Sequence, residues 1–202
     1  MPALLFCIIL FVTLFHFRLK RIQQAEQTDQ EEYLALERKA AMPIKRNLND
    51  LPYVTIPLEQ LPFSKLKTKA GEEYEATLQQ LAKEKLCNLA SSSATDLKLK
   101  YGAKNFSLLT RYEENYQLYV VTLANWCEAL FQDGQWEAAL QVGSCALACQ
   151  SDVSKTYRIM AQIYLQEDDY DALHHLADTV AGIPSPLDLK KTVYDVLNQT
   201  GI

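Results

Sequence analysis

The chain has 202 residues, a length typical of one domain or of one domain with an appendage. Its formal net charge is −5, from 20 basic and 25 acidic residues, which disfavours a general nucleic-acid-binding protein because such proteins carry basic surfaces. Apolar residues make up 49% and charged residues 22%, a composition that excludes wholesale disorder. Six Gly, seven Pro and five Cys also exclude collagen-like, low-complexity and small disulfide-stapled chains.

The N-terminal run MPALLFCIILFVTLFHF contains no charged side chain, and Arg18, Lys20 and Arg21 follow almost at once. As a helix this run rises about 25 Å. Extension to residue 22, with the basic side chains reaching the headgroups, lets it cross a hydrocarbon core of roughly 30 Å. We therefore predict an uncleaved transmembrane anchor over residues 1–22. The alternatives are a buried soluble helix and a signal peptide, which places its basic residues before the apolar run and small residues at its cleavage site.

No Lys or Arg precedes the apolar run, and a basic cluster follows it. The positive-inside rule therefore predicts a single-pass membrane protein with its N-terminus outside and its C-terminal domain in the cytoplasm. Residues 18–69 carry a net charge of +3 and residues 70–202 a net charge of −8. Basic residues beside an anchor gain attraction to anionic lipid, although they also simply fix topology. Free thiols in helical sequence suit a reducing compartment, and those beyond the anchor are Cys87, Cys127, Cys145 and Cys149.

Two segments separate the anchor from the rest of the chain. Residues 23–42 consist of helix-forming residues without Gly or Pro, which predicts a polar juxtamembrane helix. Residues 43–68 contain four prolines, which predict an extended conformation. The apolar side chains over 51–63 are too many for a free linker. We favour a strap that packs on the domain, and the alternative is a partner-binding segment that becomes ordered on contact.

From residue 69 to residue 202 the pattern predicts an all-α domain. Apolar residues at helical spacing favour a helix across 70–90, and a second long helix is expected over 107–132. Between them, Thr95 or Asp96 is expected to cap a short element that Gly102 interrupts. This half of the sequence shows no convincing alternating pattern typical of a strand.

The helical domain contains an internal repeat. When residues 120–153 are compared with residues 154–187, large apolar residues meet large ones and small residues meet small ones. Matched pairs include Leu123 with Tyr157, Trp126 with Met160, Cys127 with Ala161, Leu130 with Tyr164, Trp136 with Tyr170 and Gly143 with Ala177. Both copies have a polar break between their helices, at residues 132–135 and 166–169.

This pattern resembles the tetratricopeptide repeat (TPR), a helix–turn–helix whose period matches the spacing of the two copies. The motif positions of the first copy hold Leu123, Trp126, Cys127, Gly134, Trp136, Ala139 and Ala146, with Cys127 in place of the usual glycine. The second copy departs further, with Asp168 at the turn glycine and Leu173 at a small position. The resemblance implies the antiparallel hairpins of an α-solenoid and a capping helix over residues 187–199. Because two repeats are too few to be stable alone, residues 70–119 are expected to stack in front of them as a degenerate repeat.

The runs DLKLKYGAKN and LPYVTIPLEQLPF also resemble small membrane-anchored bacterial proteins that carry a TPR-like domain and no assigned activity. No catalytic constellation is evident. The adjacent His174 and His175 point about 100° apart on a helix, and the i,i+4 pair Cys145 and Cys149 fills only half of a tetrahedral zinc site. We therefore expect no enzyme activity, no cofactor and no metal, and keep a thiol or metal enzyme as a remote alternative.

The predicted function is binding. In stacked repeats the first helix of each pair lines a concave groove, where cationic side chains beside apolar ones suit acidic or C-terminal peptides. In this register the groove residues are Val121, Ala124, Glu128 and Phe131 in the first copy and Lys155, Arg158, Gln162 and Leu165 in the second. An ordinary charged helix face is the alternative for these positions. The leading interpretation is a membrane-tethered adaptor or scaffold that binds a protein or peptide, and the alternative is a structural subunit that assembles through the anchor and the Pro-rich strap.

Overall fold

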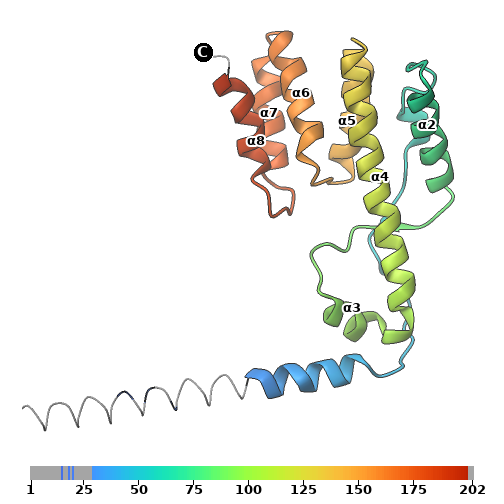
Figure 1. Ribbon diagram of the computed structural model, residues 1–202, viewed down its shortest axis with the longest axis vertical. Coiled ribbons are helices and arrows are strands. Elements are labelled where there is room, and N and C mark those ends of the chain that lie inside the picture. Colours follow the sequence, from blue (N-terminus) through green and yellow to red (C-terminus); the bar gives the residue numbers. More distant parts are fainter. Residues whose placement is uncertain (1–14, 16–17, 19, 21–28, 200–202) are drawn as a thin grey trace, which may run out of the picture. The chain divides into compact units, whose positions relative to one another are not determined.

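The computed structural model describes residues 29–199 and, before them, Phe15, Arg18 and Lys20 (Figure 1). The predicted anchor over residues 1–22 therefore lies outside the described residues, apart from these three. No helix in the described part of the chain is both long enough and apolar enough to cross a membrane. The described chain is mainly helical, which confirms the all-α expectation.

The chain divides into two compact units that cut across the boundaries expected near residues 42 and 68. Unit 1 comprises Met1–Leu48 and Ser92–Phe106, and unit 2 comprises Asn49–Ser91 and Ser107–Ile202. The charges divide with the units. Unit 1 holds ten basic and six acidic residues, a net charge of +4, whereas unit 2 holds ten basic and nineteen acidic residues, a net charge of −9.

In unit 1, residues 29–40 are helical, within the segment over 23–42 for which a helix was expected, and residues 23–28 lie outside the described residues. Helix α3 (Ala94–Tyr101) begins with a capping box in which Ser93 and Asp96 satisfy each other's backbone amides. It ends at Gly102, and the 3₁₀ helix η2 (Ala103–Asn105) follows. Helix α4 (Phe106–Gln132) starts here and continues into unit 2, close to the bounds expected from the sequence.

Unit 2 starts with the Pro-rich segment, which is extended apart from the 3₁₀ helix η1 (Leu58–Gln60). Its strand β1 (Tyr53–Val54) pairs antiparallel with β2 (Leu86–Cys87), and helix α2 (Lys69–Leu81) lies between them in the sequence. The apolar side chains Ile56, Leu61 and Leu66 belong to the same core cluster as Tyr116 and Trp126 of α4. The segment is therefore a strap packed on its own domain over residues 49–68.

The structure differs from the sequence-based expectation at β2. The apolar spacing predicts a continuous helix across residues 70–90, but α2 ends at Leu81 and residues 86–87 form a strand. The same spacing indicates burial correctly, since Leu86 and Cys87 are both buried. The backbone of the strap needs hydrogen-bond partners, and the paired strand supplies them at the cost of the helix.

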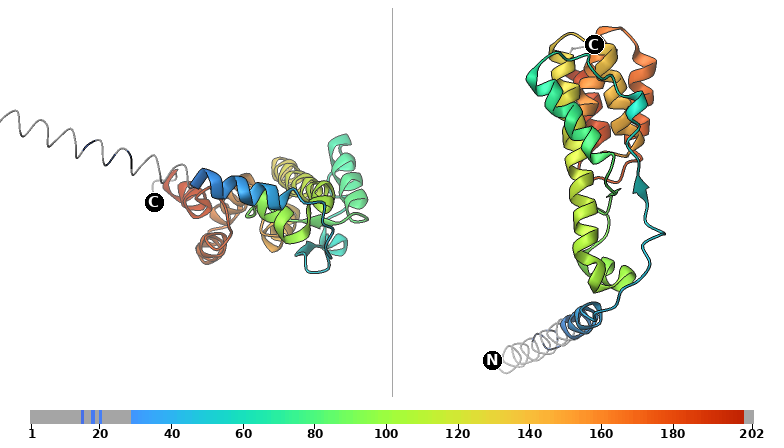
Figure 2. Two further views of the ribbon diagram at one scale, coloured as in Figure 1. Left: turned by 90° about the horizontal axis from the view of Figure 1, so that it is seen from below. Right: turned by 90° about the vertical axis from the view of Figure 1, so that its right-hand side faces the viewer.

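The rest of unit 2 is a succession of antiparallel helices, α4 with α5 (Trp136–Ala148), α6 (Ser154–Gln166) with α7 (Tyr170–Val180), and α8 (Leu189–Gln199) (Figures 1 and 2). The ends of the two hairpins recur at the spacing of the sequence repeat: α4 and α6 end at positions 132 and 166, and α5 and α7 begin at positions 136 and 170. Helix α8 falls within the expected cap over 187–199, and its Leu189, Val193 and Val196 complete a second core cluster with α6 and α7.

Candidate functional site

The eight predicted groove residues lie on α4 and α6, the first helices of the two hairpins, and we call this region the α4–α6 surface. The structure makes some of them accessible and others not. Val121 is 45% exposed and Arg158 is exposed, whereas Glu128, Lys155 and Gln162 are half-buried. Ala124 is only 1% exposed, so its methyl group cannot contact a ligand. The two remaining side chains pack partly against the cores and contribute little free surface: Phe131 and Leu165.

Lys155 connects the two helices of the α4–α6 surface. Its Nζ lies 2.8 Å from Oε2 of Glu128 and 2.8 Å from Oδ1 of Asn125, both on α4. The structure thus brings two predicted groove residues into one ion pair. Asn125 was missed by sequence reasoning, although its position three residues before Glu128 places it on the same helix face. With side chains 38% and 42% exposed, the pair contributes less to stability than to the relative placement of the two helices.

Arg158 is the cation of the α4–α6 surface that remains available to a ligand. It forms no ion pair with any residue that the structure describes. Leu118, also missed by sequence reasoning, precedes Val121 by three residues and is 50% exposed. The surface therefore combines two exposed aliphatic side chains on α4 with a guanidinium on α6, a combination suited to a peptide that carries a carboxylate.

A cavity of about 780 Å³ lies in unit 2, between the strap, the α4–α5 hairpin and the loop at residues 184–186. Tyr119 lines it from α4, is fully buried, and has a hydroxyl group without a hydrogen-bond partner in the described chain. The one carboxylate among the lining residues is Asp152, and no cation among the described residues lines the cavity.

The thiols of unit 2 are poor nucleophiles. Burial raises the pKa of Cys127 to about 12 and that of Cys149 to about 12, and burial also raises the pKa of Cys145. These thiols are therefore protonated near neutral pH, whereas nucleophilic attack and metal binding need the thiolate. Nowhere in the described residues do three His, Cys, Asp or Glu side chains lie close enough together to hold a metal ion.

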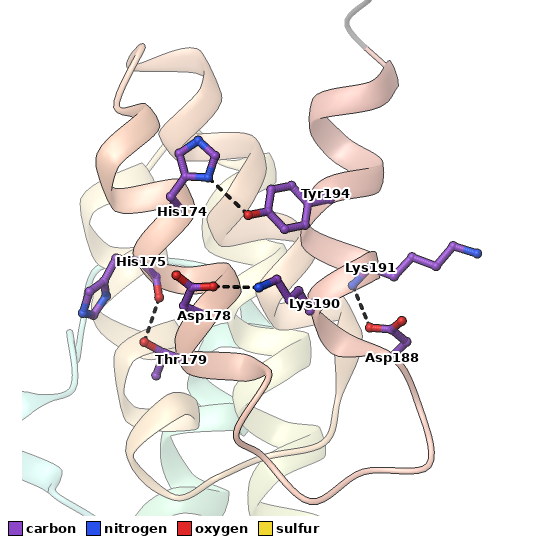
Figure 3. Close-up of polar contacts among 8 residues, drawn as sticks. All are labelled: His174, His175, Asp178, Thr179, Asp188, Lys190, Lys191 and Tyr194. Atoms are coloured by element: carbon purple, nitrogen blue, oxygen red, sulfur yellow. Dashed lines mark hydrogen bonds and ion pairs between the residues drawn. The ribbon is translucent and has the colours of Figure 1, made fainter.

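The histidine pair lies on α7 and does not form one site. The Nδ1 atom of His174 is 3.2 Å from the hydroxyl oxygen of Tyr194 on α8, while His175 points in a different direction (Figure 3). Beside them, the 2.7 Å ion pair between Lys190 and Asp178 joins the same two helices. These groups connect the capping helix to the preceding hairpin.

The chain matches no protein-family model, no curated protein and no solved structure.

Proposed function

We propose that this protein is a membrane-tethered interaction module with a TPR-like helical domain, and that it binds a protein or peptide on the α4–α6 surface without catalysing a reaction. The anchor over residues 1–22 holds it in the membrane, with the N-terminus outside and the helical domain in the cytoplasm. The observation that carries the proposal is the regular recurrence of the hairpin ends, because repeats of this kind expose the first helix of each pair on one surface.

The chemistry of the α4–α6 surface indicates the class of partner. Arg158 offers a planar pair of donors for a carboxylate, and Leu118 and Val121 offer apolar contact area on the neighbouring first helix. Lys155 is neutralised by Glu128, so its role is to fix the spacing of the two helices. The expected partner is a protein with an acidic or C-terminal segment that carries apolar side chains.

The test is affinity capture from detergent extracts with the full-length chain. Arg158→Glu reverses the available charge and Val121→Asp removes an apolar contact, and neither change touches the core. Lys83→Glu is the matched control, because Lys83 is exposed just after α2 and forms no ion pair with a described residue. We expect both surface variants to lose a partner that wild type and the control retain. Partner lists that do not change in either surface variant would contradict the proposal.

The cavity beside the strap favours a second candidate, a structural subunit that assembles through the anchor and the strap. Deleting the strap is not a clean test, because Ile56, Leu61 and Leu66 are core residues. Thr55→Arg with Glu59→Arg changes two exposed positions of the strap and leaves the core intact. Release of the partner by this double variant, together with full retention by Arg158→Glu, would favour the second candidate over the first.

A further inference from the structure

Unit 1 contains a small cleft of about 290 Å³ that combines cationic and apolar side chains. Its lining residues include Lys39, Arg46 and Lys98 together with Met42, Ile44 and Leu99. We propose that this cleft binds the phosphate groups of anionic phospholipids, so that unit 1 lies on the charged surface of the membrane. The proposal deepens the membrane tethering described above and rests on it.

The cleft is built from two segments that are far apart in the sequence. The backbone amide of Arg46 donates to the carbonyl of Tyr101 at 3.1 Å, and that of Lys104 donates to the carbonyl of Ile44 at 3.2 Å. Asn105, which is 2% exposed, donates through Nδ2 to the carbonyls of Arg46 at 2.7 Å and Tyr101 at 2.9 Å. These bonds fix the segment around residues 44–46 against the end of α3, and thereby place cations from both segments around one cleft.

The cations of the cleft belong to a larger unbalanced cluster. Residues 37–48 and 92–106 together hold seven basic residues and two acidic residues, Glu37 and Asp96. Among the residues that the structure describes, no carboxylate lies within ion-pair distance of any of the seven. The seven are Arg38, Lys39, Lys45, Arg46, Lys98, Lys100 and Lys104. A concentration of cations without carboxylate partners in the described chain is the electrostatic signature of a surface that meets anions.

The apolar side chains distinguish a lipid from other anions. Met42 is 53% exposed and Ile44 is 44% exposed, and both line the cleft together with the cations. A free phosphate ion or a nucleic-acid backbone gives such side chains nothing to pack against. A membrane surface supplies phosphates for the cations and acyl chains for the aliphatic groups, as it does for amphipathic interfacial segments. The anchor predicted over residues 1–22 belongs to the same unit as the cleft. In the proposed function this anchor keeps the cleft near the membrane surface.

The experiment places the full-length chain in nanodiscs of phosphatidylcholine alone and of phosphatidylcholine mixed with anionic phosphatidylglycerol. Hydrogen–deuterium exchange is then measured for peptides covering residues 38–48 and 94–106. We expect exchange several-fold slower in the anionic discs, and we expect high salt to abolish the difference because surface charge is screened. A peptide covering α5, in unit 2, serves as the internal reference.

Matched charge reversals identify the cations responsible. Lys39→Glu with Lys98→Glu is expected to remove the slowing, whereas Lys67→Glu with Lys83→Glu applies the same change of charge to exposed positions of unit 2 and is expected to retain it. If the first variant already exchanges faster than wild type in phosphatidylcholine discs, its fold is altered. The neutral pair Lys39→Gln with Lys98→Gln then replaces it and is expected to weaken the slowing.

Several results would overturn the proposal. Equal exchange in the two kinds of disc refutes the lipid site while leaving the tethering intact, because the chain still elutes with the disc. Slowing in phosphatidylcholine discs on addition of millimolar inorganic phosphate, or of a short DNA duplex, assigns the cleft to another anion. A chain that does not elute with nanodiscs refutes the tethering itself, and the lipid site falls with it.

Discussion

Gly134 and Asp168, which occupy equivalent positions in the two hairpins, both adopt a left-handed backbone, with φ of 75° and 55°. Each stands two positions after a first helix ends and two positions before a second helix begins. The amide of the following residue donates to a carbonyl five positions back in both turns, Gln135 to Leu130 at 2.9 Å and Asp169 to Tyr164 at 2.8 Å. The two hairpins therefore share one turn geometry, a helix C-terminus closed by a left-handed residue.

This shared geometry predicts opposite effects for two substitutions. Gly134→Val puts a β-branched side chain into a left-handed conformation and is expected to lower the free energy of unfolding by about 1–2 kcal/mol. No neighbouring atom lies within 4 Å of a Cβ at this position, so the cost comes from the backbone alone. Asp168→Gly removes the same kind of strain and is expected to raise the free energy of unfolding by about 0.5 kcal/mol. Chemical denaturation measures both, and a loss of stability in Asp168→Gly would contradict the shared turn.

A pair of buried tyrosines tests the hydrogen bonding of the core. The hydroxyl of Tyr157 donates to the carbonyl of Ser151 at 2.6 Å, so Tyr157→Phe is expected to cost about 1 kcal/mol and to leave that carbonyl unpaired. The hydroxyl of Tyr119 has no such partner among the described residues, so Tyr119→Phe is expected to leave the free energy of unfolding unchanged or to raise it. If Tyr119→Phe proves as costly as Tyr157→Phe, the cavity supplies a hydrogen-bond acceptor to Tyr119.

The contact between Gly102 and Ile44 predicts local destabilisation of unit 1. Gly102 has φ of 90°, and a Cβ built there would lie against the carbonyl oxygen of Ile44. We expect Gly102→Ala to separate residues 44–46 from α3 and to speed amide exchange in residues 38–48. Exchange in α5 is expected to stay as in wild type. Protection of residues 38–48 that survives the substitution would show that the segment is held by other contacts.

The buried thiols predict that stability falls at alkaline pH. Burial raises the pKa of Cys87 to about 11 and the pKa values of Cys127 and Cys149 to about 12, from an ordinary value of 9.0. Between pH 9 and pH 11 the unfolded chain loses protons that the folded chain keeps, so the free energy of unfolding decreases as pH rises. The stabilisation is complete below pH 9 and is lost toward pH 12.

Thermal melts between pH 7 and pH 10 measure this dependence. A variant with Cys87, Cys127 and Cys149 replaced by Ala is the comparison, and its melting temperature is expected to fall less over the same range, whatever its stability at pH 7. Parallel curves for the two proteins would assign the alkaline loss to other groups, such as the buried tyrosines.

The periodic spacing of apolar residues predicted the helices well, but it did not predict the pairing of strands β1 and β2. The bounds of α4 follow from apolar spacing, because a helix face that must be buried leaves its period in the sequence. Helix α8 lies where the resemblance to the TPR implies a capping helix. Strand β2 has only two residues, too few to show an alternating pattern in the sequence. Its two residues are buried by contact with a strap more than thirty positions away, and a single-sequence pattern does not encode that partner.

Only part of the α4–α6 surface was predicted correctly. The register implied by the TPR resemblance placed Glu128 and Lys155 on the first helices of the two hairpins, and the structure joins them. The same register also treated Ala124 as a groove residue, since a helical wheel gives the direction of a side chain and not the depth at which a small one lies. The sequence did not predict the cationic cleft, because α3 was expected to stack with the helices that follow it. The structure instead groups α3 with residues that precede it by more than forty positions.

The division of unit 1 into two stretches of sequence has a consequence for the order in which the protein folds. Its stabilising contacts close loops of 54 to 59 residues, between Arg46 and Lys100, Glu37 and Thr95, and Arg46 and Asn105. Loop closure of this length carries an entropic cost that short-range helical contacts do not. During synthesis the N-terminal stretch leaves the ribosome long before its complement. The cationic cleft is therefore assembled only after residue 105 has emerged from the ribosome, so the N-terminal stretch of unit 1 spends the synthesis of more than fifty residues without its complement.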